Sequence, residues 1–298
     1  MLMLAMQRAD LPLELADSPL VRILLIGYAL IFFGGLLVNV LMLSDLSLHL
    51  QRWRKAVMRF VWRPWGLNEA ARILLAIMAM TLLGWWLALI LAHFGGIQLA
   101  DQAGWALVWQ SVFSHWAAIF IVLWMMGKYE IRWVPGFLHR GWRWHRDIGS
   151  GVIAYVAAMP YILLYAALYQ IWLQSRGYEP ELQDAMRIYA ELPAGGVRIY
   201  FIFLALVLAP VAEELLFRGV LLPALSRRFG VGAAIVVSSA LFALMHMHVP
   251  GLVPLFLLSI ALSVAYIYTR SVIVPIVMHM VFNSVSLLAM TITLQAGV

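Results

Sequence analysis

Two carboxyl groups and a guanidinium group lie inside an apolar segment in the last third of the chain, at Glu213, Glu214 and Arg218. Glu214 and Arg218 are four residues apart and share one face of a helix, so they can form an ion pair. His279 and Asn283 have the same spacing in a later apolar segment and therefore point to one place. Charges within apolar helices are costly and are usually paired or functional, so these residues are the first candidates for chemistry.

Glu213 has no local counter-ion, because it is turned about 100° around the helix from Glu214. A desolvated carboxyl group without a counter-ion exchanges its proton more readily near neutral pH. His246, four residues after Phe242, adds an imidazole from another apolar segment. Peptide hydrolysis needs a base for water, an acid for the leaving amine and a group that stabilises the oxyanion. A carboxyl, imidazole and amide set can supply all three.

Other histidines have simpler interpretations. His115 stands alone in its apolar segment, and we expect it to be a packing or hydrogen-bonded residue. His248 lies beside Pro250 and is expected at the membrane interface. A Glu–Arg pair in a membrane helix can also be purely structural, so Glu214 and Arg218 are weaker candidates for chemistry than Glu213.

Three spaced motifs resemble those of a known family. They are Glu-Glu-x-x-x-Arg at 213–218, Phe-x-x-x-His at 242–246 and His-x-x-x-Asn at 279–283. Together, and in this order, they resemble the CAAX-protease and bacteriocin-processing family of intramembrane endopeptidases, which includes the enzymes that trim prenylated CAAX proteins. The resemblance covers about residues 199–288 and is not broken at any motif position.

This resemblance implies a bundle of about eight helices around a polar cavity that is open to water and to a lipid-borne substrate. It implies that Glu213 activates water, that His246 helps to hold this water, and that His279 and Asn283 stabilise the oxyanion. Glu214 and Arg218 resemble the supporting pair, with Phe242 as the motif phenylalanine, although Glu214 could lie closer to the chemistry.

These residues are compatible with two mechanisms, one with a metal ion and one without. Glu213, His246 and His279 would make a His₂Glu zinc site with an open position for water. Asparagine is a poor zinc ligand, so Asn283 fits the oxyanion role in either scheme. We expect a glutamate base that acts on water without an obligatory metal, with zinc as the one candidate cofactor.

Composition predicts the elements that position these residues. Of the 298 residues, 64% are hydrophobic and 11% are charged, whereas soluble domains have about 25% charged residues. A membrane-spanning helix needs about 20 apolar residues. Eight segments are candidates, at 20–43, 73–94, 105–126, 151–173, 199–225, 231–247, 252–269 and 272–294, of which 199–225 is interrupted by charge and 231–247 is short. We therefore predict an all-α, polytopic membrane helix bundle, with residues 1–198 as N-terminal helices and 199–298 as the catalytic helices of one continuous membrane domain.

Charge in the connections predicts an orientation. Segments 49–63 and 127–149 are rich in Lys and Arg, whereas 94–104 has neither and 174–197 is net acidic. By the positive-inside rule both termini are non-cytoplasmic, and we expect the bacterial inner (plasma) membrane. Residues 180–192 can form a short amphipathic helix on the outer surface. The absence of cysteine excludes disulfides, Cys-ligated zinc and a thiol nucleophile.

Two other functional classes use the same residue types. A proton-coupled carrier would show an inverted repeat, and the sequence shows none. A catalytically inactive scaffold or bacteriocin immunity protein of the same fold would be favoured by the loss of a motif residue, and none is lost. We therefore expect an endopeptidase acting on a membrane-associated protein or peptide, with no nucleic-acid partner. A prenylated C-terminus, a leader peptide and a membrane-anchored regulator all remain open as substrates.

Overall fold

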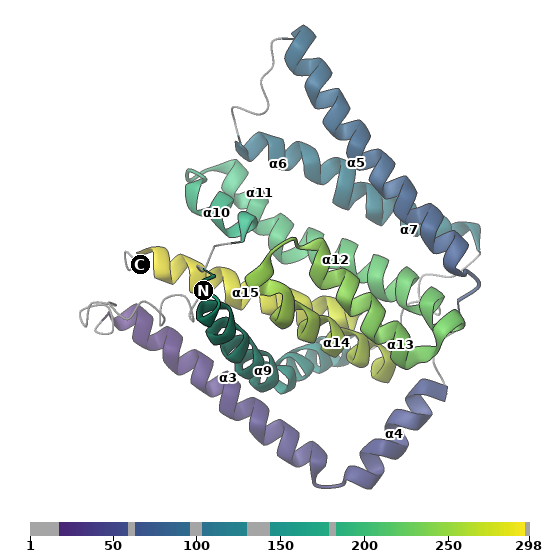
Figure 1. Cartoon of the computed structure of the whole chain (residues 1–298), viewed down its shortest axis with the longest axis vertical. Coiled ribbons are helices and arrows are strands. Elements are labelled where there is room, and N and C mark those ends of the chain that lie inside the picture. The colour runs from purple at the N-terminus through teal and green to yellow at the C-terminus, as the bar shows by residue number, and fades with distance from the viewer. Residues whose placement is uncertain (1–17, 59–62, 96–102, 130–143, 179–182, 296–298) are drawn as a thin grey trace.

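The computed structural model describes residues 18–58, 63–95, 103–129, 144–178 and 183–295, and every regular element in these ranges is helical. Figure 1 shows their arrangement. In chain order the helices are α3 (Pro19–Leu43), α4 (Leu46–Met58), α5 (Leu67–Gly95), α6 (Ala103–Ser111), the π-helix η1 (Val112–Trp116), α7 (Ala117–Lys128), α9 (Trp144–Ser175), α10 (Asp184–Glu191), α11 (Gly196–Phe203), the π-helix η2 (Leu204–Leu208), α12 (Ala209–Glu214), the π-helix η3 (Leu215–Leu221), α13 (Leu222–Met245), the 3₁₀-helix η4 (Val249–Gly251), α14 (Leu252–Thr269) and α15 (Ile273–Gln295).

The predicted polytopic helical bundle is confirmed. Seven helical runs in the described residues are long and apolar enough to cross a membrane. One of them, Gly196–Met245, has 50 residues, far more than the roughly 20 that one crossing needs. Its backbone leaves the helical conformation at Gly230, where φ is 79° and ψ is 162°. This bend divides the run into the two segments expected at 199–225 and 231–247, which reconciles seven runs with about eight predicted segments.

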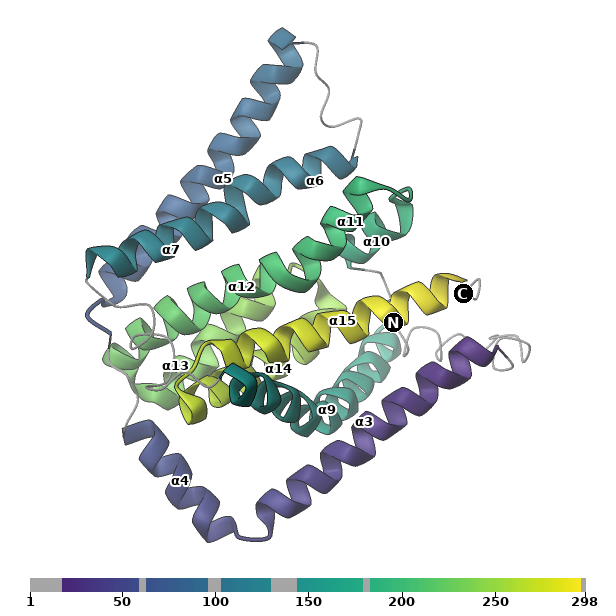
Figure 2. The same cartoon turned by 180° about the vertical axis from the view of Figure 1, so that it is seen from behind.

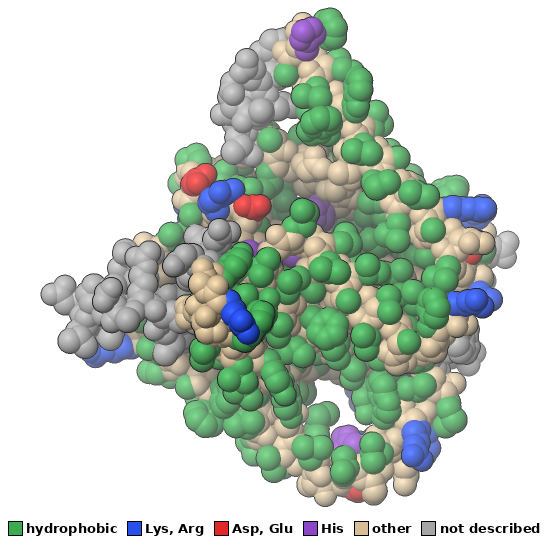
Figure 3. All heavy atoms as spheres, viewed as in Figure 1, with side chains coloured by type: hydrophobic (Ala, Val, Ile, Leu, Met, Phe, Trp, Pro, Cys, Tyr) green, Lys and Arg blue, Asp and Glu red, His purple; other side chains and the backbone are tan. Residues whose placement is uncertain are grey.

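The helices that carry the motifs form the centre of the molecule. Helices α9, α12, α13, α14 and α15 lie between α3 with α4 on one side and α5 with α7 on the other, in both views (Figures 1 and 2). The outer helices expose most of their apolar side chains. In the apolar stretch of α3, and likewise in that of α5, only 11% of the residues are buried. Apolar side chains also cover most of the face in Figure 3. An apolar exterior around a buried centre is what contact with lipid requires.

The basic connections meet at one end of the bundle. Contacts between the ends of distant helices show this: Trp53 with Tyr268, Arg227 with Pro64, and Ser271 with Asp147. The opposite end holds the start of α6, where Gly104 lies against Leu192 and Val197. This segregation of charge agrees with the positive-inside pattern, while the orientation relative to the cytoplasm stays a prediction. Most of the predicted basic segment 127–149 lies outside the described residues.

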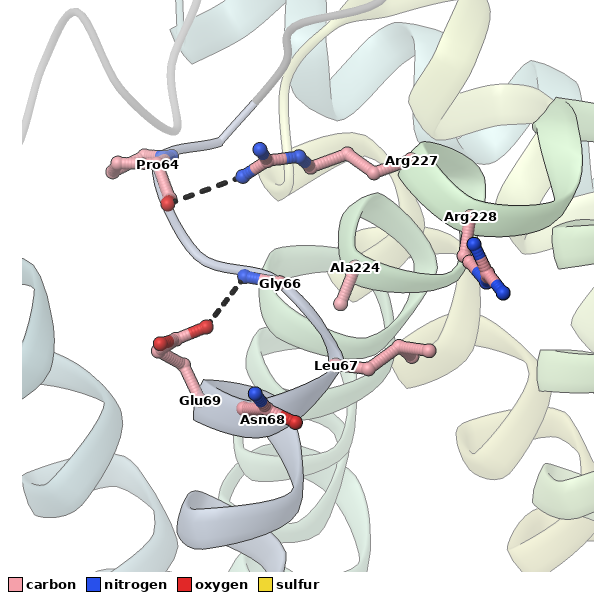
Figure 4. A pocket seen from close by; sticks show the side chains of 8 residues that line it. All are labelled: Pro64, Gly66, Leu67, Asn68, Glu69, Ala224, Arg227 and Arg228. Carbon is pink, nitrogen blue, oxygen red and sulfur yellow. Dashed lines mark hydrogen bonds between the residues drawn. The ribbon is translucent and has the colours of Figure 1, made fainter.

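Arg227 joins the start of α5 to α13 at the basic end. Its guanidinium donates to the carbonyl of Pro64 at 3.2 Å, and the Glu69 carboxylate accepts the N–H of Gly66 at 2.8 Å (Figure 4). A shallow cavity of about 410 Å³ lies between these groups. Trp65, fully buried, donates its indole N–H to the Val220 carbonyl at 3.3 Å. These bonds hold the chain before α5 against η3, next to the motif residues.

Two polar segments are helical. The segment 49–63, predicted as a basic connection between membrane helices, begins within α4, because alternating apolar and basic residues give that stretch an amphipathic face. Tertiary contacts such as that of Trp53 with Tyr268 then hold it. The amphipathic helix expected within 180–192 is present as α10.

Helix α3 approaches α9 closely at Gly35. A Cβ atom added to Gly35 would collide with the carbonyl oxygen of Val156 and lie 2.6 Å from Pro160 Cγ. Asn39, one turn later, donates to the Ala157 carbonyl at 2.8 Å. The small residues in this part of the sequence permit close helix contact, and the structure shows that Gly35 makes that contact within the chain.

Gly35→Val is therefore expected to destabilise the protein. The added methyl groups must push α3 away from α9, and overpacking of this kind typically costs about 1–3 kcal/mol. The midpoint of thermal unfolding in detergent measures the effect. Gly27→Val is the matched control, because no atom lies within 4 Å of an added Cβ there. Equal midpoints for the two variants would contradict the proposed packing.

Candidate active site

Glu213 and Glu214 are held at the centre of the bundle by an irregular helix. They end α12, which lies between the π-helices η2 and η3. A π turn contains one residue more than an α turn, so it changes which side chains face a given neighbour and leaves backbone carbonyls without regular partners; such turns are frequent at functional sites. Asn283 on α15 donates its amide to the carbonyl of Ala205 in η2 at 2.8 Å. This bond ties the third motif to the helix that carries the first.

Glu214, Arg218 and His279 form a buried network. Arg218 Nη1 donates to Glu214 Oε1 at 3.0 Å, as the four-residue spacing predicted. His279 Nδ1 lies 2.9 Å from the same oxygen. Arg218 Nη2 donates to both the carbonyl and the hydroxyl of Ser259 on α14 at 2.8 Å. The side chains of Glu214 and Arg218 are 0% and 1% exposed, so this network is closed to water.

Glu213 differs from Glu214 in its surroundings. Its side chain is 26% exposed, and its Oε2 lies 3.9 Å from His279 Nε2, too far for a hydrogen bond. Neither Glu213 Oε2 nor Glu214 Oε2 has a hydrogen-bond partner among the described residues, so the two carboxylates differ in exposure and in the two bonds made to Glu214 Oε1. Two adjacent carboxylates therefore have different environments, one fixed by an arginine and one left accessible, which is how proteins give two like groups different roles.

His246 directly follows the last residue of α13, one helical turn after Phe242. Its Nδ1 lies 2.7 Å from the Phe242 carbonyl oxygen. A carbonyl can only accept, so Nδ1 carries the proton and Nε2 has the free lone pair in the neutral ring. The helix ends here because Met247 takes a left-handed conformation, with φ of 47°.

The Phe242 ring is an apolar side chain that contacts both imidazoles of the site. It is 1% exposed and packs against His246 and His279, with ring centroids 4.8 Å and 5.7 Å away. The Arg218 guanidinium carbon lies 5.2 Å from the centre of the same ring, which adds a cation–π contact. Phe242 thus fixes both imidazoles and shields the ion pair, which explains physically why a phenylalanine precedes His246 by one turn.

A cavity of about 640 Å³ connects these residues. Glu213, His246, His279 and Asn283 all line it, whereas Glu214 and Arg218 do not. The rest of its wall is mainly apolar and includes residues of α9, α10 and α11. The structure therefore brings together the four residues that the sequence nominated for chemistry and places the two supporting residues behind them.

Two histidines that sequence reasoning set aside also line this cavity. His248 was expected at the membrane interface and His115 in a packed or hydrogen-bonded position. His115 does make a hydrogen bond, to Ser114 Oγ at 2.9 Å, but its place in the cavity wall was not foreseen. No spacing signal links it to the motifs, because it lies about a hundred residues earlier in the chain and reaches the site only through tertiary packing.

The predicted zinc ligands are of types that bind zinc, but they do not lie close together. In the described part of the chain, no three His, Cys, Asp or Glu side chains lie close enough to hold a metal ion. His279 is also engaged through Nδ1 by Glu214. The zinc set of Glu213, His246 and His279 stays a prediction.

The fold and the site together define a polytopic membrane protein with a buried Glu–Arg–His network beside an accessible glutamate in a membrane-embedded cavity. Residues 195–285 match the family of Rce1-like proteins, described as type II CAAX prenyl endopeptidase Rce1-like. The chain therefore carries an Rce1-like domain, which contains all three motifs and confirms the resemblance found in the sequence. At the level of the family, this match supports an intramembrane CAAX-type protease. Searches of curated proteins and of solved structures gave no match to this chain.

Proposed function

We propose that this protein is an intramembrane endopeptidase that hydrolyses a peptide bond in a membrane-associated protein or peptide. The observation that carries the proposal is the contrast between Glu213 and Glu214. One carboxylate is bound through Oε1 by Arg218 and His279 and is closed to water, and its neighbour lines the cavity with a side chain that is 26% exposed. A free carboxylate at the wall of a membrane cavity is suited to activate water, and the imidazole and amide groups around it supply the other functions that hydrolysis needs.

Glu213 acts as the base in this mechanism. It takes a proton from a water molecule, whose oxygen attacks the carbonyl carbon of the substrate. His246 accepts a hydrogen bond from the same water through Nε2, because its Nδ1 proton is committed to the Phe242 carbonyl. Glu213 then returns the proton to the leaving nitrogen, and the C–N bond breaks. Each acid–base step of this kind contributes about 10²–10⁴ in rate.

Asn283 and His279 stabilise the oxyanion. Asn283 has two amide protons and uses one on the Ala205 carbonyl, so the other is available. His279 donates through Nε2 when it is an imidazolium, with Nδ1–H directed at Glu214.

Glu214 and Arg218 support this arrangement without contacting substrate. Arg218 anchors Glu214 to α14 through Ser259, and Glu214 in turn orients the His279 ring. A carboxylate that holds an imidazole in one tautomer is a recurring device in hydrolases. No step in this mechanism passes through a metal.

The test of function is cleavage by the purified protein in detergent. Membrane-anchored peptides with varied sequences are incubated with the protein, and the products are identified by mass spectrometry, with metal content measured on the same samples. We expect cleavage in preparations with less than 0.1 equivalent of zinc. Cleavage that follows zinc content would instead support the metal scheme. Absence of cleavage across a broad set would favour the inactive scaffold or immunity protein.

Asn283→Ala is expected to lower kcat about 10²–10³-fold, the usual cost of removing one oxyanion donor. Asn39→Ala is the matched control, because Asn39 also donates its amide to backbone carbonyls, of Gly35 and Ala157, but lies outside the cavity. The control is expected to lower stability while keeping the rate per folded molecule. Equal rates for both variants, corrected for folded protein, would remove Asn283 from the mechanism.

A further inference from the structure

His115 belongs to the cavity wall although it lies outside the family-matched segment 195–285. It sits in η1, the π-helix between α6 and α7, and η1 packs against α12. Helix α12 carries Glu213, so the wall with His115 is next to the proposed base. The ring is half-buried, as are Glu213, His246 and Asn283.

Ser114 fixes the tautomer of His115. Ser114 Oγ donates to the Gln110 carbonyl at 2.8 Å, and the same Oγ lies 2.9 Å from His115 Nδ1. A hydroxyl has one proton, which the carbonyl receives, so Oγ accepts the Nδ1–H of the ring. The neutral ring then carries its lone pair on Nε2, and the hydrogen bond that His115 makes to the described residues is the one through Nδ1.

The cavity thus contains an imidazole acceptor that the proposed mechanism does not use. Water activation, proton return and oxyanion stabilisation are assigned to other residues. A peptide substrate, however, brings main-chain N–H groups into a mainly apolar cavity. Each N–H that loses water without a new acceptor costs about 1–3 kcal/mol. A fixed acceptor beside the base removes that cost for one N–H and sets the position of the peptide.

We propose that His115 Nε2 accepts a hydrogen bond from a main-chain N–H of the substrate near the scissile bond, which makes His115 a substrate-binding residue of this active site. The inference rests on the proposed endopeptidase function. It extends the site to the first half of the chain, where the family match provides no residue. It also gives η1 a role, because the π turn places His115 against α12.

The experiment compares His115→Phe with wild type on the membrane-anchored peptide that wild type cleaves best. Phenylalanine keeps the ring and loses the acceptor. We expect the KM to rise about five- to tenfold, the equivalent of one hydrogen bond, with kcat changed less than threefold, because the bond is made in both the ground and the transition state. His115→Gln, which retains an acceptor in a similar position, is expected to recover at least half of the loss.

A scan of N-methylated peptides locates the bond. Methylation of one main-chain nitrogen in turn removes one N–H at a time. Wild type is expected to lose affinity at the N–H that His115 binds, and His115→Phe to be insensitive at that position alone. Ser114→Ala removes the group that fixes the tautomer and is expected to raise the KM two- to fivefold. His93→Phe is the matched control, because His93 is exposed at the end of α5, outside the cavity.

Failure of this inference and failure of the proposed function have different signatures. If wild type cleaves none of the membrane-anchored peptides, the proposed function fails. If Glu213→Gln is inactive but His115→Phe keeps the wild-type KM and responds to every N-methyl peptide as wild type does, the function stands and the role of His115 is overturned. A rise in KM that Gln does not recover, and that no N-methyl position abolishes, would show that the ring only shapes the cavity and would equally overturn the proposal.

Discussion

Replacing Glu213 with glutamine is expected to lower the rate of peptide cleavage at least about 10³-fold. The proposed mechanism uses Glu213 twice, to take a proton from water and to return it to the leaving nitrogen, and each acid–base role contributes about 10²–10⁴. Glutamine has the same shape but cannot accept the proton of water. The measurement is the initial rate of cleavage of a membrane-anchored peptide in detergent, per folded molecule.

The fold is expected to be unaffected by this change. Glu213 Oε2 has no hydrogen-bond partner among the described residues, and the side chain is 26% exposed, so glutamine breaks no bond that stabilises the bundle. Glu191→Gln is the matched control, because Glu191 is exposed on α10 and does not line the cavity. A Glu213→Gln rate within threefold of that of Glu191→Gln would remove Glu213 as the base.

Arg218→Leu is expected to have the largest effect on stability, about 3–5 kcal/mol of unfolding free energy, the usual cost of breaking a buried ion pair. The change leaves Glu214, 0% exposed, without its guanidinium partner, and releases both oxygens of Ser259. Lysine is not a substitute, because it lacks the forked geometry that reaches Glu214 and Ser259 at once. Denaturant unfolding in detergent measures the loss.

A double variant separates charge from packing. Glu214→Gln combined with Arg218→Met removes both charges, so it should be more stable than Arg218→Leu alone, because the penalty comes mainly from the unpaired carboxylate. It should still cleave slowly, because His279 loses the carboxylate that orients it. Arg228→Leu, at an exposed position at the basic end, is expected to change stability by less than about 0.5 kcal/mol. Equal losses for Arg228→Leu and Arg218→Leu would contradict the assignment of Arg218 as a buried anchor.

Helix formation and the local pairs could be predicted from the sequence, because both depend on short-range spacing. Apolar runs of about 20 residues predicted the membrane helices, and a four-residue separation predicted the Glu214–Arg218 pair. Even the division of the 50-residue run at Gly230 agreed with two separate apolar segments. The motif residues were likewise nominated by type and spacing, and the structure places all four proposed catalytic residues in one cavity.

Contacts between segments that are far apart in the sequence could not be predicted from residue spacing. His279 is 65 residues from Glu214, and nothing local indicates that its Nδ1 meets the oxygen already bound by Arg218. The contact of Gly35 with α9, the helical state of α4 and the position of His115 in the wall of the cavity also depend on packing. The sequence by itself determined which apolar segments form membrane helices and which ionisable residues they carry, because spacing along one helix is fixed by its geometry. Only the tertiary structure decided that the Glu214 carboxylate is buried and that the Glu213 carboxylate is accessible from the cavity, because burial and hydrogen-bond partners depend on how separate helices pack.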